Sequence, residues 1–368
     1  MSICDSMDDG VVSEIREQYS HYTARRLLFI AIFAVVLVFM SLISITVGTR
    51  NLSIEQVYAL LIDHLQGAVY DRTLEYDLWY DDNIVWNYRL PRVIFAIIAG
   101  ASLSVAGATM QSVMKNPLAD PYTTGISSGA LLGVAVAMVL GFVAGKGGID
   151  SFGLVLNAMT FAMIPVMTIY FLSPILRKSP ATLILAGTAV SYLFNSVTDI
   201  LLVSTDDQTL ADVYRWQVGS LADLSWDAIP LPLFSCVVGS LILFCLSHKM
   251  NLMSLDDADA KSLGLDSEQL RLVCLVLLSF MAASVISYSG VIGFVGLIVP
   301  HMVRLLLGAD NRFVIPASFI TGATFLLFCD IVSRLLDVSA AIPVGVVTAL
   351  FGSPIFLFLI LRNKREVW

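Results

Sequence analysis

The feature that most constrains this chain is a series of ten apolar segments, each close to the length of a helix that crosses a lipid bilayer. Such a crossing takes roughly 20 residues. In lipid, backbone polar groups must be paired within the chain, so helices are expected. The sequence predicts an all-α fold, a polytopic transmembrane helical bundle of about ten spans. We place these at Leu27–Val47, Val93–Met114, Ile126–Val143, Phe152–Ser173, Leu183–Val203, Ile229–Ser247, Leu270–Tyr288, Val291–Leu307, Val314–Leu335 and Ile342–Leu361.

Composition supports the same interpretation. Hydrophobic residues make up 57% of the 368 residues and charged residues only 14%, whereas a soluble domain carries roughly 25% charged residues. The first apolar run starts after a polar stretch and is long enough to span, so we expect a true first helix and no cleaved signal. The predicted parts are an N-terminal segment 1–26, a membrane domain 27–362 and a short tail 363–368.

The distribution of Lys and Arg predicts the orientation. With a cytoplasmic N-terminus, fourteen Lys and Arg residues fall in inner segments and seven in outer segments. Inner connections of membrane proteins carry the excess of positive charge. We therefore predict a multi-pass protein of the cell membrane with both termini in the cytoplasm, which requires an even number of spans.

Three connections are too long to be simple turns. The outer segment 48–88 holds an amphipathic piece, Ser53–Leu65, followed by an acidic, aromatic stretch. The outer segment 205–227 has the aromatic composition of a helix at the membrane surface. The inner segment 249–269 is predicted to form short helices broken near Gly264.

Polar groups within the spans are few. The second and third segments are rich in Gly, Ala and Ser, which indicates either close helix packing or the wall of a translocation path. Asp199 and Asp330 are the main intramembrane charges, and such carboxylates are functional candidates by default. Both lie near predicted outer ends where we expect water to reach, so we assign neither to a proton relay.

Several kinds of chemistry are not indicated. No Cys-x-x-Cys pair is present, and the four histidines are scattered, so neither a disulfide nor a metal site is predicted. The sequence contains no nucleophile elbow, metalloprotease motif or phosphate-binding loop. We therefore expect no cofactor and no catalytic residue, and any ATP that drives this protein must be bound by another chain.

An ordered set of motifs resembles one known family. The set comprises Arg89-Leu90-Pro91-Arg92, Gly107-Ala108-Thr109-Met110-Gln111, Asn116-Pro117-Leu118-Ala119-Asp120-Pro121, Leu185-Ala186-Gly187, Trp216-Gln217-Val218-Gly219-Ser220-Leu221, Ser262-Leu263-Gly264, Ile292-Gly293-Phe294-Val295-Gly296 through Pro300-His301, and Ile342-Pro343-Val344-Gly345. The chain resembles the FecCD family of ABC importer permeases, which includes cobalamin, haem and iron-siderophore importers. The similarity extends from about Leu27 to Arg362.

The resemblance implies an assembly around this chain. It implies a homodimer with ten spans per subunit and a path along the dimer axis. It also implies two cytoplasmic ATP-binding subunits and one extracytoplasmic substrate-binding protein. The cargo would be a metal chelate, namely an iron siderophore, haem or cobalamin, with iron chelates favoured because they are the commonest cargo of the family.

The resemblance also implies residue roles. Arg89, Arg92 and Arg334 fall at outer ends of spans, where arginines at these motif positions receive acidic residues of the binding protein. Guanidinium groups form bidentate pairs with carboxylates, although snorkelling to lipid headgroups is the alternative.

Two further roles belong to the inner face. The stretch from Leu252 to Glu268 resembles a coupling helix that contacts the ATPase, with Leu255, Ala260, Leu263 and Gly264 as coupling residues; a solvated loop is the alternative. Asn116 and Leu118 are gate candidates, and a plain proline turn is their alternative.

Three positions depart from the family pattern. Asp256 stands where a glycine is common, Ala341 where a glutamate is common, and Asn311 where a histidine is common. The leading hypothesis remains an ABC permease. An ion-coupled secondary transporter would need ionisable residues at the membrane midplane, and the spans carry almost none. An intramembrane enzyme would need a convergent polar constellation, and none is visible in the sequence.

Overall fold

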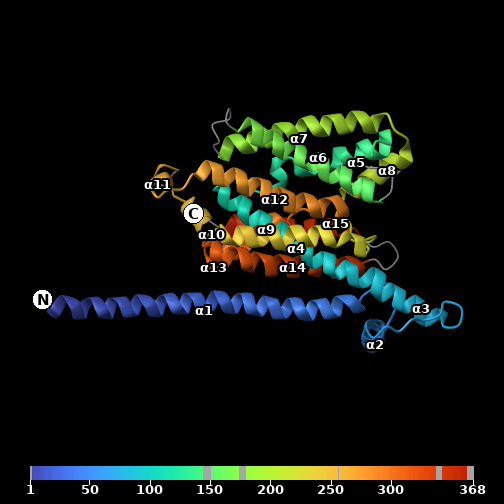
Figure 1. Cartoon of the computed structure of the whole chain (residues 1–368), viewed down its shortest axis with the longest axis horizontal. Coiled ribbons are helices and arrows are strands. Elements are labelled where there is room, and N and C mark those ends of the chain that lie inside the picture. Colours follow the sequence, from blue (N-terminus) through green and yellow to red (C-terminus); the bar gives the residue numbers. More distant parts are fainter. Residues whose placement is uncertain (1, 144–150, 174–179, 256, 337–341, 363–368) are drawn as a thin grey trace.

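The chain folds into a bundle of long helices, seen in a computed structural model that describes residues 2–143, 151–173, 180–255, 257–336 and 342–362 (Figure 1). In these described residues the regular secondary structure is entirely helical. Seven helical stretches are long and apolar enough to cross a membrane, and three shorter apolar helices accompany them. The predicted polytopic helical bundle is confirmed.

Each of the ten predicted segments overlaps one long or apolar helix. These helices are α1 Ser2–Thr46, α4 Leu90–Val113, α5 Ile126–Leu140, α6 Ser151–Leu172, α7 Pro180–Val203, α9 Pro230–Cys245, α12 Ser267–Ser289, α13 Val295–Leu307, α14 Asn311–Leu336 and α15 Val344–Arg362.

Two helices differ from the predicted bounds. Helix α1 begins at Ser2 and so includes almost all of the predicted N-terminal segment 1–26. Helix α13 begins four residues later than predicted, because Gly290 and Phe294 both have positive φ and interrupt the helix. At 13 residues α13 is roughly 20 Å long, which is shorter than the hydrocarbon core.

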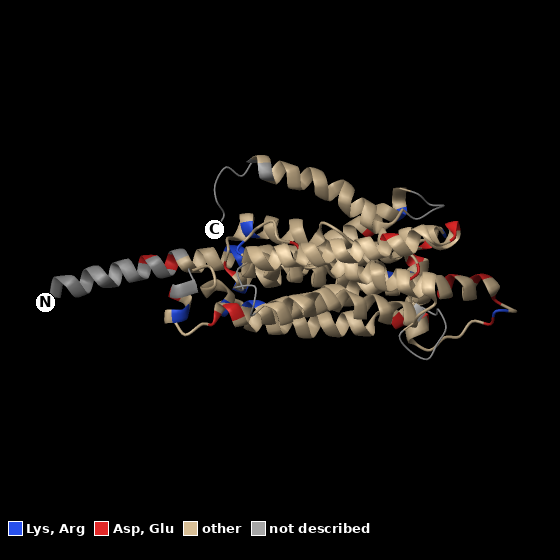
Figure 2. Cartoon of the chain, turned by 90° about the horizontal axis from the view of Figure 1, so that it is seen from above, with Lys and Arg blue, Asp and Glu red and all other residues tan. Residues whose placement is uncertain are grey.

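The connecting elements divide between the two ends of the bundle. One end, called here the α2 end, carries α2 Ile54–Leu65, α3 Tyr76–Asn83, the π-helix Ile84–Arg89, α8 Asp207–Gln217 and the short helix Trp226–Ala228. The opposite end, called the α11 end, carries α10 Ser247–Leu252 and α11 Asp257–Ser262. The short helix Pro121–Thr124 lies inside the bundle, where the Tyr122 hydroxyl donates to the Ile292 carbonyl before α13. Figure 2 shows Lys, Arg, Asp and Glu gathered towards these ends, with little charge between them.

The predicted character of these connections is confirmed in three places. Ser53 caps α2 with a complete capping box, in which its hydroxyl and the Gln56 side chain each accept from the other's backbone N–H. The connection 205–227 contains α8. The segment 249–269 forms short helices, and Gly264 adopts a φ of +82° after α11.

Both chain ends approach the α11 end. Helix α14 starts beside Asn251 of α10 and finishes beside Ser44 of α1, so α15, which follows it, runs back towards the α11 end. Helix α1 also starts there (Figure 1). An even number of crossings follows, while the side that faces the cytoplasm stays a prediction. Residues 363–368, the predicted tail, lie outside the described residues.

The centre of the bundle is α4, which is buried along almost its whole length. Its glycines allow direct backbone contact with neighbours, because a methyl group at Gly100 would overlap the carbonyl of Gly322 and one at Gly107 would overlap the carbonyl of Gly296. Of the two interpretations of the small residues, close packing therefore applies to these positions of α4.

Candidate functional site

The outermost helices of the bundle present very different faces. Helices α1 and α7 lie on opposite sides of the bundle in Figure 1. Between Leu27 and Ile43, every exposed side chain of α1 is apolar, which suits contact with lipid tails. Helix α7 is also largely exposed, but a polar stripe follows its exposed face at helical spacing. This α7 stripe consists of Thr188, Tyr192, Asn195 and Asp199.

The α7 stripe runs between exposed apolar side chains, among them Leu185, Leu193 and Ile200. No partner is recorded for the side chains of Asn195 and Asp199 among the described residues. A polar or charged group inside a membrane generally faces water or another protein group. The stripe therefore marks the side of the bundle that meets either an aqueous path or a second subunit.

A large cavity opens at the α2 end, next to α8. Its volume is about 1200 Å³, above the roughly 300–1,000 Å³ of pockets for drug-sized ligands. Apolar side chains such as Phe152, Leu154 and Leu224 form part of its lining, together with aromatic, hydroxyl and acidic side chains. The lining includes Tyr214, Arg215, Trp216, Ser220, Asp223, Ser225, Asp227, Ser287, Tyr288, Ser289 and Pro343.

Two of the family motifs contribute to the wall of this cavity, one through Trp216, Val218 and Ser220 and the other through Pro343. Three glycines allow the chain after α8 to pass against the end of α12 and the start of α15. A methyl group at Gly219 would overlap the carbonyl of Val291, one at Gly290 that of Trp216, and one at Gly345 that of Val218.

Hydrogen bonds lock this glycine junction. The amide of Ser220 donates to the Ser289 carbonyl at 2.7 Å, and the amide of Gly345 donates to the Gly219 carbonyl at 3.1 Å. Gly219 and Gly290 have φ near +70°, a conformation that only glycine adopts without strain. The motifs that hold Gly219 and Gly345 were visible in the sequence, but their contact with each other and with Gly290 was not.

The three arginines predicted to dock the binding protein converge at the α2 end, but their guanidinium groups are engaged within the chain. Arg92 and Arg334 each lie 2.8 Å from a carboxylate oxygen of Asp330. Arg334 also donates to the carbonyls of Ser44 and Val47 at the end of α1. Their side chains are 11% and 7% exposed.

Arg89 follows the same pattern. It is 5% exposed and donates to the carbonyls of Thr46 at 3.0 Å and Arg50 at 2.5 Å. These carbonyls belong to the last turn of α1 and the residues after it, which lack partners within the helix. Arg89 and Arg334 attach the end of α1 to the bundle, whereas Arg92 joins α4 to Asp330 and Ser333 of α14. Their role in docking stays a prediction.

The structure corrects the expectation that water reaches both intramembrane carboxylates. Asp199 is exposed on α7, whereas Asp330 is fully buried. Asp330 is surrounded by the helix bundle and is compensated by Arg92 and Arg334, which is the usual arrangement for a buried charge.

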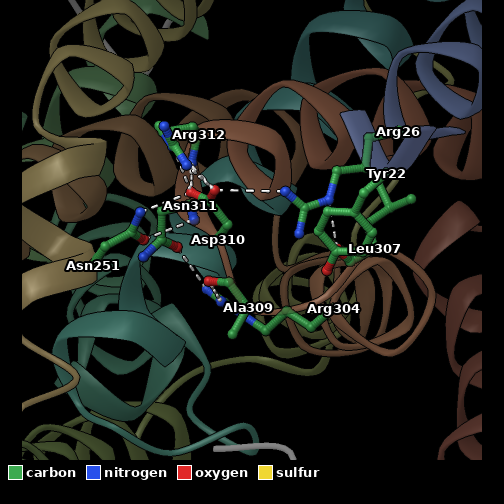
Figure 3. Close-up of polar contacts among 9 residues, drawn as sticks. All are labelled: Tyr22, Arg26, Asn251, Arg304, Leu307, Ala309, Asp310, Asn311 and Arg312. Atoms are coloured by element: carbon green, nitrogen blue, oxygen red, sulfur yellow. Dashed lines mark hydrogen bonds and ion pairs between the residues drawn. The ribbon is translucent and has the colours of Figure 1, made fainter. Parts of the chain in front are cut away.

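A second polar cluster, at the α11 end, joins four helices and the turn between two of them (Figure 3). Asp310 precedes α14 and accepts from Asn251 of α10 at 2.7 Å and from Arg312 at 2.6 Å. Arg26 of α1 lies 3.5 Å from the same carboxylate. Partial burial favours the neutral form, but the bonds from Arg312 and Asn251 outweigh it and hold the pKa of Asp310 at about 2.

Asn311, where the family commonly has histidine, lies inside this cluster. Its side-chain oxygen accepts from Arg304 at 3.0 Å and from Ser112 of α4 at 2.7 Å, and its amide donates to Asn251 at 2.8 Å. Asn311 thus joins α4, α10, α13 and α14. The other two departures, Asp256 and Ala341, lie outside the described residues.

The predicted coupling residues lie at the α11 end with different exposures. Leu255 and Leu263 are 41% and 61% exposed, whereas Ala260 is fully buried. Gly264 has no neighbour near its missing side chain. Two apolar side chains are therefore available to a partner, and Ala260 fixes the segment to the bundle.

The gate candidates lie directly beside this segment. The side-chain carbonyl of Asn116 accepts from the amide of Leu118 at 2.9 Å, and Leu118 is 47% exposed. Lys115 donates to the Leu255 carbonyl at 2.7 Å. Arg271, near the start of α12, donates to the Val113 carbonyl at 2.9 Å.

Fold and site define a polytopic helical membrane protein with a large cavity at one end and an exposed polar helix. The FecCD transport family model matches residues 36–362. The chain therefore belongs to the FecCD transport family, as the motifs predicted.

Relatives and a solved structure agree with this assignment. The chain is 38% identical to the cobalamin import permease BtuC of Halobacterium salinarum, covering 77% of this chain and 74% of that one. It is 38% identical to the hemin transport permease HmuU of Yersinia pestis, covering 77% and 84%. It also resembles a metal-chelate type ABC transporter in an inward-facing conformation, with a TM-score of 0.78, 30% identity and coverage of 90% and 98%.

Proposed function

We propose that this chain is the permease subunit of an ABC importer and passes a metal chelate from the α2 end to the α11 end. The observation that carries the proposal is the exposed polar stripe of α7, at the edge of a bundle whose other outer helix, α1, is apolar towards lipid. A translocation path must be wet, and α7 offers a polar face along a membrane-spanning helix.

The path lies between two copies of this chain. A single subunit leaves α7 exposed over most of its length, with Asn195 and Asp199 unpaired among the described residues. Pairing two subunits through a two-fold axis would enclose both α7 faces around a shared path. This arrangement is the homodimer that the family resemblance implies.

Two kinds of partner protein fit the two ends. Two cytoplasmic ATP-binding subunits would contact the α11 end, where Leu255 and Leu263 are exposed. One extracytoplasmic binding protein would deliver cargo to the cavity at the α2 end. This orientation follows the distribution of Lys and Arg and puts both termini in the cytoplasm.

The contacts at the α11 end support coupling between ATPase and gate. Lys115 links the chain after α4 to Leu255, and Arg271 links the end of α4 to α12. A movement of the segment 249–269 would therefore pull directly on Asn116 and Leu118. Both residues keep the gate role predicted for them as part of this proposal.

Docking through Arg89, Arg92 and Arg334 would require their guanidinium groups to leave their present partners. Each guanidinium would have to leave carbonyls of α1 or the Asp330 carboxylate before it could receive a carboxylate of the binding protein. These arginines contribute to docking most simply by holding α1 and α14 in position beneath the docking face.

The cargo belongs to the metal chelates carried by relatives. Cobalamin and haem are named for two relatives with 38% identity, iron(3+)-hydroxamate for one with 32% identity and molybdate for one with 31% identity; of these we favour the bulky chelates. The cavity volume of about 1200 Å³ accommodates a bulky chelate. An ion-coupled secondary transporter is less well supported, because Asp330 is neutralised by two arginines.

Cysteine accessibility along α7 tests the path. In a variant without native cysteines, Tyr192→Cys and Asn195→Cys should react with a hydrophilic, membrane-impermeant maleimide. The controls are Thr198→Cys, which is 1% exposed on the same helix, and Val35→Cys on the lipid face of α1. Equal labelling at all four positions, or labelling at the controls only, would contradict a path along α7.

The energy source is tested in the complete transporter. Reconstituted with its ATP-binding subunits and binding protein, the chain should take up a labelled ferric hydroxamate, haem or cobalamin only with ATP. Uptake should persist when ionophores remove ion gradients. Uptake that needs a gradient and no ATP would favour the ion-coupled alternative.

A further inference from the structure

The charged side chains that line the cavity at the α2 end are mainly negative. Two carboxylates, Asp223 and Asp227, line it and are exposed. Neither has a recorded hydrogen bond or ion pair among the described residues. The cation in the lining, Arg215, is already paired with Asp212 at 3.4 Å. The lining therefore presents negative charge to whatever enters.

The surroundings of the cavity have the same sign. The connections 48–88 and 204–229 contain twelve Asp and Glu residues and three Lys or Arg residues. The cations that could have balanced this surface, Arg89, Arg92 and Arg334, are buried in the chain. Clefts lined by one sign of charge with low-dielectric walls concentrate counter-ions and repel like charges.

Helix α7, proposed above to face the translocation path, contributes no residue to the cavity lining but has the same sign of charge. Helix α7 contains no Lys or Arg, and its single charged residue is Asp199, near the α2 end of the α7 stripe. Aromatic side chains accompany the carboxylates in the cavity, namely Tyr214, Trp216 and Tyr288. Aromatic faces attract organic groups and cations rather than anions.

We propose that this cavity selects its cargo by charge, admitting neutral or cationic metal chelates and rejecting polyanionic chelates and oxyanions. This inference rests on the proposed function, because it assumes that cargo enters through the cavity. The cavity provides the site and the carboxylates set its charge preference, with Asp223 and Asp227 as specificity-determining residues. The α2 end as a whole supplies the long-range field.

Charged thiol reagents measure this preference without any transport partner. The probe position is Ser225→Cys in a variant without native cysteines, since Ser225 is exposed in the cavity lining and makes no cap hydrogen bond. The purified full-length protein is placed in uncharged lipid nanodiscs at low ionic strength. The rates of reaction with a cationic and an anionic methanethiosulfonate are compared, each divided by its rate with a free small thiol.

The cationic reagent should react faster by on the order of tenfold, because two carboxylates act on opposite charges with little screening. Asp223→Asn with Asp227→Asn should bring the ratio close to that of the free thiol. Glu55→Gln on α2 removes one carboxylate away from α8 and should leave most of the preference intact. Added salt should reduce the preference in the parent protein.

The outcomes separate the inference from the proposed function. Rapid reaction with both reagents, with no charge preference or with an unchanged ratio after both Asp→Asn substitutions, would overturn the charge selection and leave the entry cavity in place. Failure of both reagents to react would show that the cavity is closed to water, which overturns the inference together with the cavity's role as the entry site.

Discussion

At the scale of residues, the most consequential group is the buried carboxylate of Asp330 between two arginines. All three residues were candidates from the sequence, Asp330 as an intramembrane carboxylate and the two arginines through the family resemblance. The sequence could not show that they compensate one another, since Arg92 and Asp330 are 238 positions apart.

The Asp330→Asn variant should be strongly destabilised. It would leave Arg92 and Arg334 facing a neutral amide in a buried setting, and removing one partner of a buried ion pair costs about 3–5 kcal/mol. The measurement is thermal unfolding of the purified protein in detergent. Asp212→Asn is the control, because it breaks an exposed pair with Arg215 and should cost at most about 1 kcal/mol. Similar losses in both variants would refute the compensating role.

Asp120 gives a prediction about pH. It caps the short helix Pro121–Thr124 by accepting from the Tyr122 amide at 2.8 Å. Burial raises its pKa to about 6, and the bond from Tyr122 only partly offsets this rise. The unfolded chain has an ordinary carboxyl pKa of about 4. Because the pKa of Asp120 is higher in the folded chain than in the unfolded chain, the protonated carboxyl adds to the free energy of unfolding at low pH. This contribution is lost as the pH rises through about 6.

The Asp120→Asn variant should remove this dependence, because an amide keeps the cap and cannot ionise. Its melting temperature should exceed that of the parent protein at pH 7.5, and the difference should shrink as the pH is lowered to 5. The pKa of Asp310 is held at about 2, so Asp310 stays ionised between pH 5 and 7.5 and should not affect how the melting temperature changes in that range. A difference that is constant from pH 5 to 7.5 would show that Asp120 titrates normally.

At the scale of elements, glycines set how closely the helices pack. The glycines can be read from the sequence, but the helices that they contact cannot. The runs of small residues predicted close approach or a path, and the two could not be distinguished until the neighbours were known. Helix α4 uses its glycines for packing. Helix α7, with fewer small residues, carries the polar face.

The Gly107→Ala variant should lose stability because its methyl group would overlap the Gly296 carbonyl and push α4 and α13 apart. Overpacking of this kind costs about 1–3 kcal/mol, and more where backbone must move. The yield of monodisperse protein and its melting temperature report the effect. Gly293→Ala, which meets no atom within 4 Å, is the matched control. Equal tolerance of both substitutions would show that the α4–α13 contact is not tight.

At the scale of the whole molecule, the two ends are distinct. The α2 end carries an acidic surface and a cavity, and the α11 end carries two exposed leucines and the links between the segment 249–269 and α4. Figure 2 shows this separation of charged ends from an uncharged middle. Such a layout suits a protein that receives cargo at one face and force at the other.

The orientation can be checked in sealed vesicles of known sidedness. Ser262→Cys at the α11 end and Leu74→Cys at the α2 end, each in a variant without native cysteines, should react with an impermeant maleimide from opposite sides. Ser262→Cys should be labelled only from the cytoplasmic side. Labelling of both positions from one side would contradict the placement of the α2 end and the α11 end on opposite faces of the membrane, and the reverse pattern would invert the orientation.

Run length, composition and short motifs are local properties, so they predicted the approximate place of the membrane helices, the three long polar connections and the family. Which polar groups face one another became visible in the tertiary structure. Asp330 lies with Arg92 and Arg334, Gly219, Gly290 and Gly345 form one backbone junction beside the cavity, and the polar face of α7 is exposed. These are contacts between residues far apart in the chain, and in lipid they depend on how helices pack rather than on how apolar each helix is.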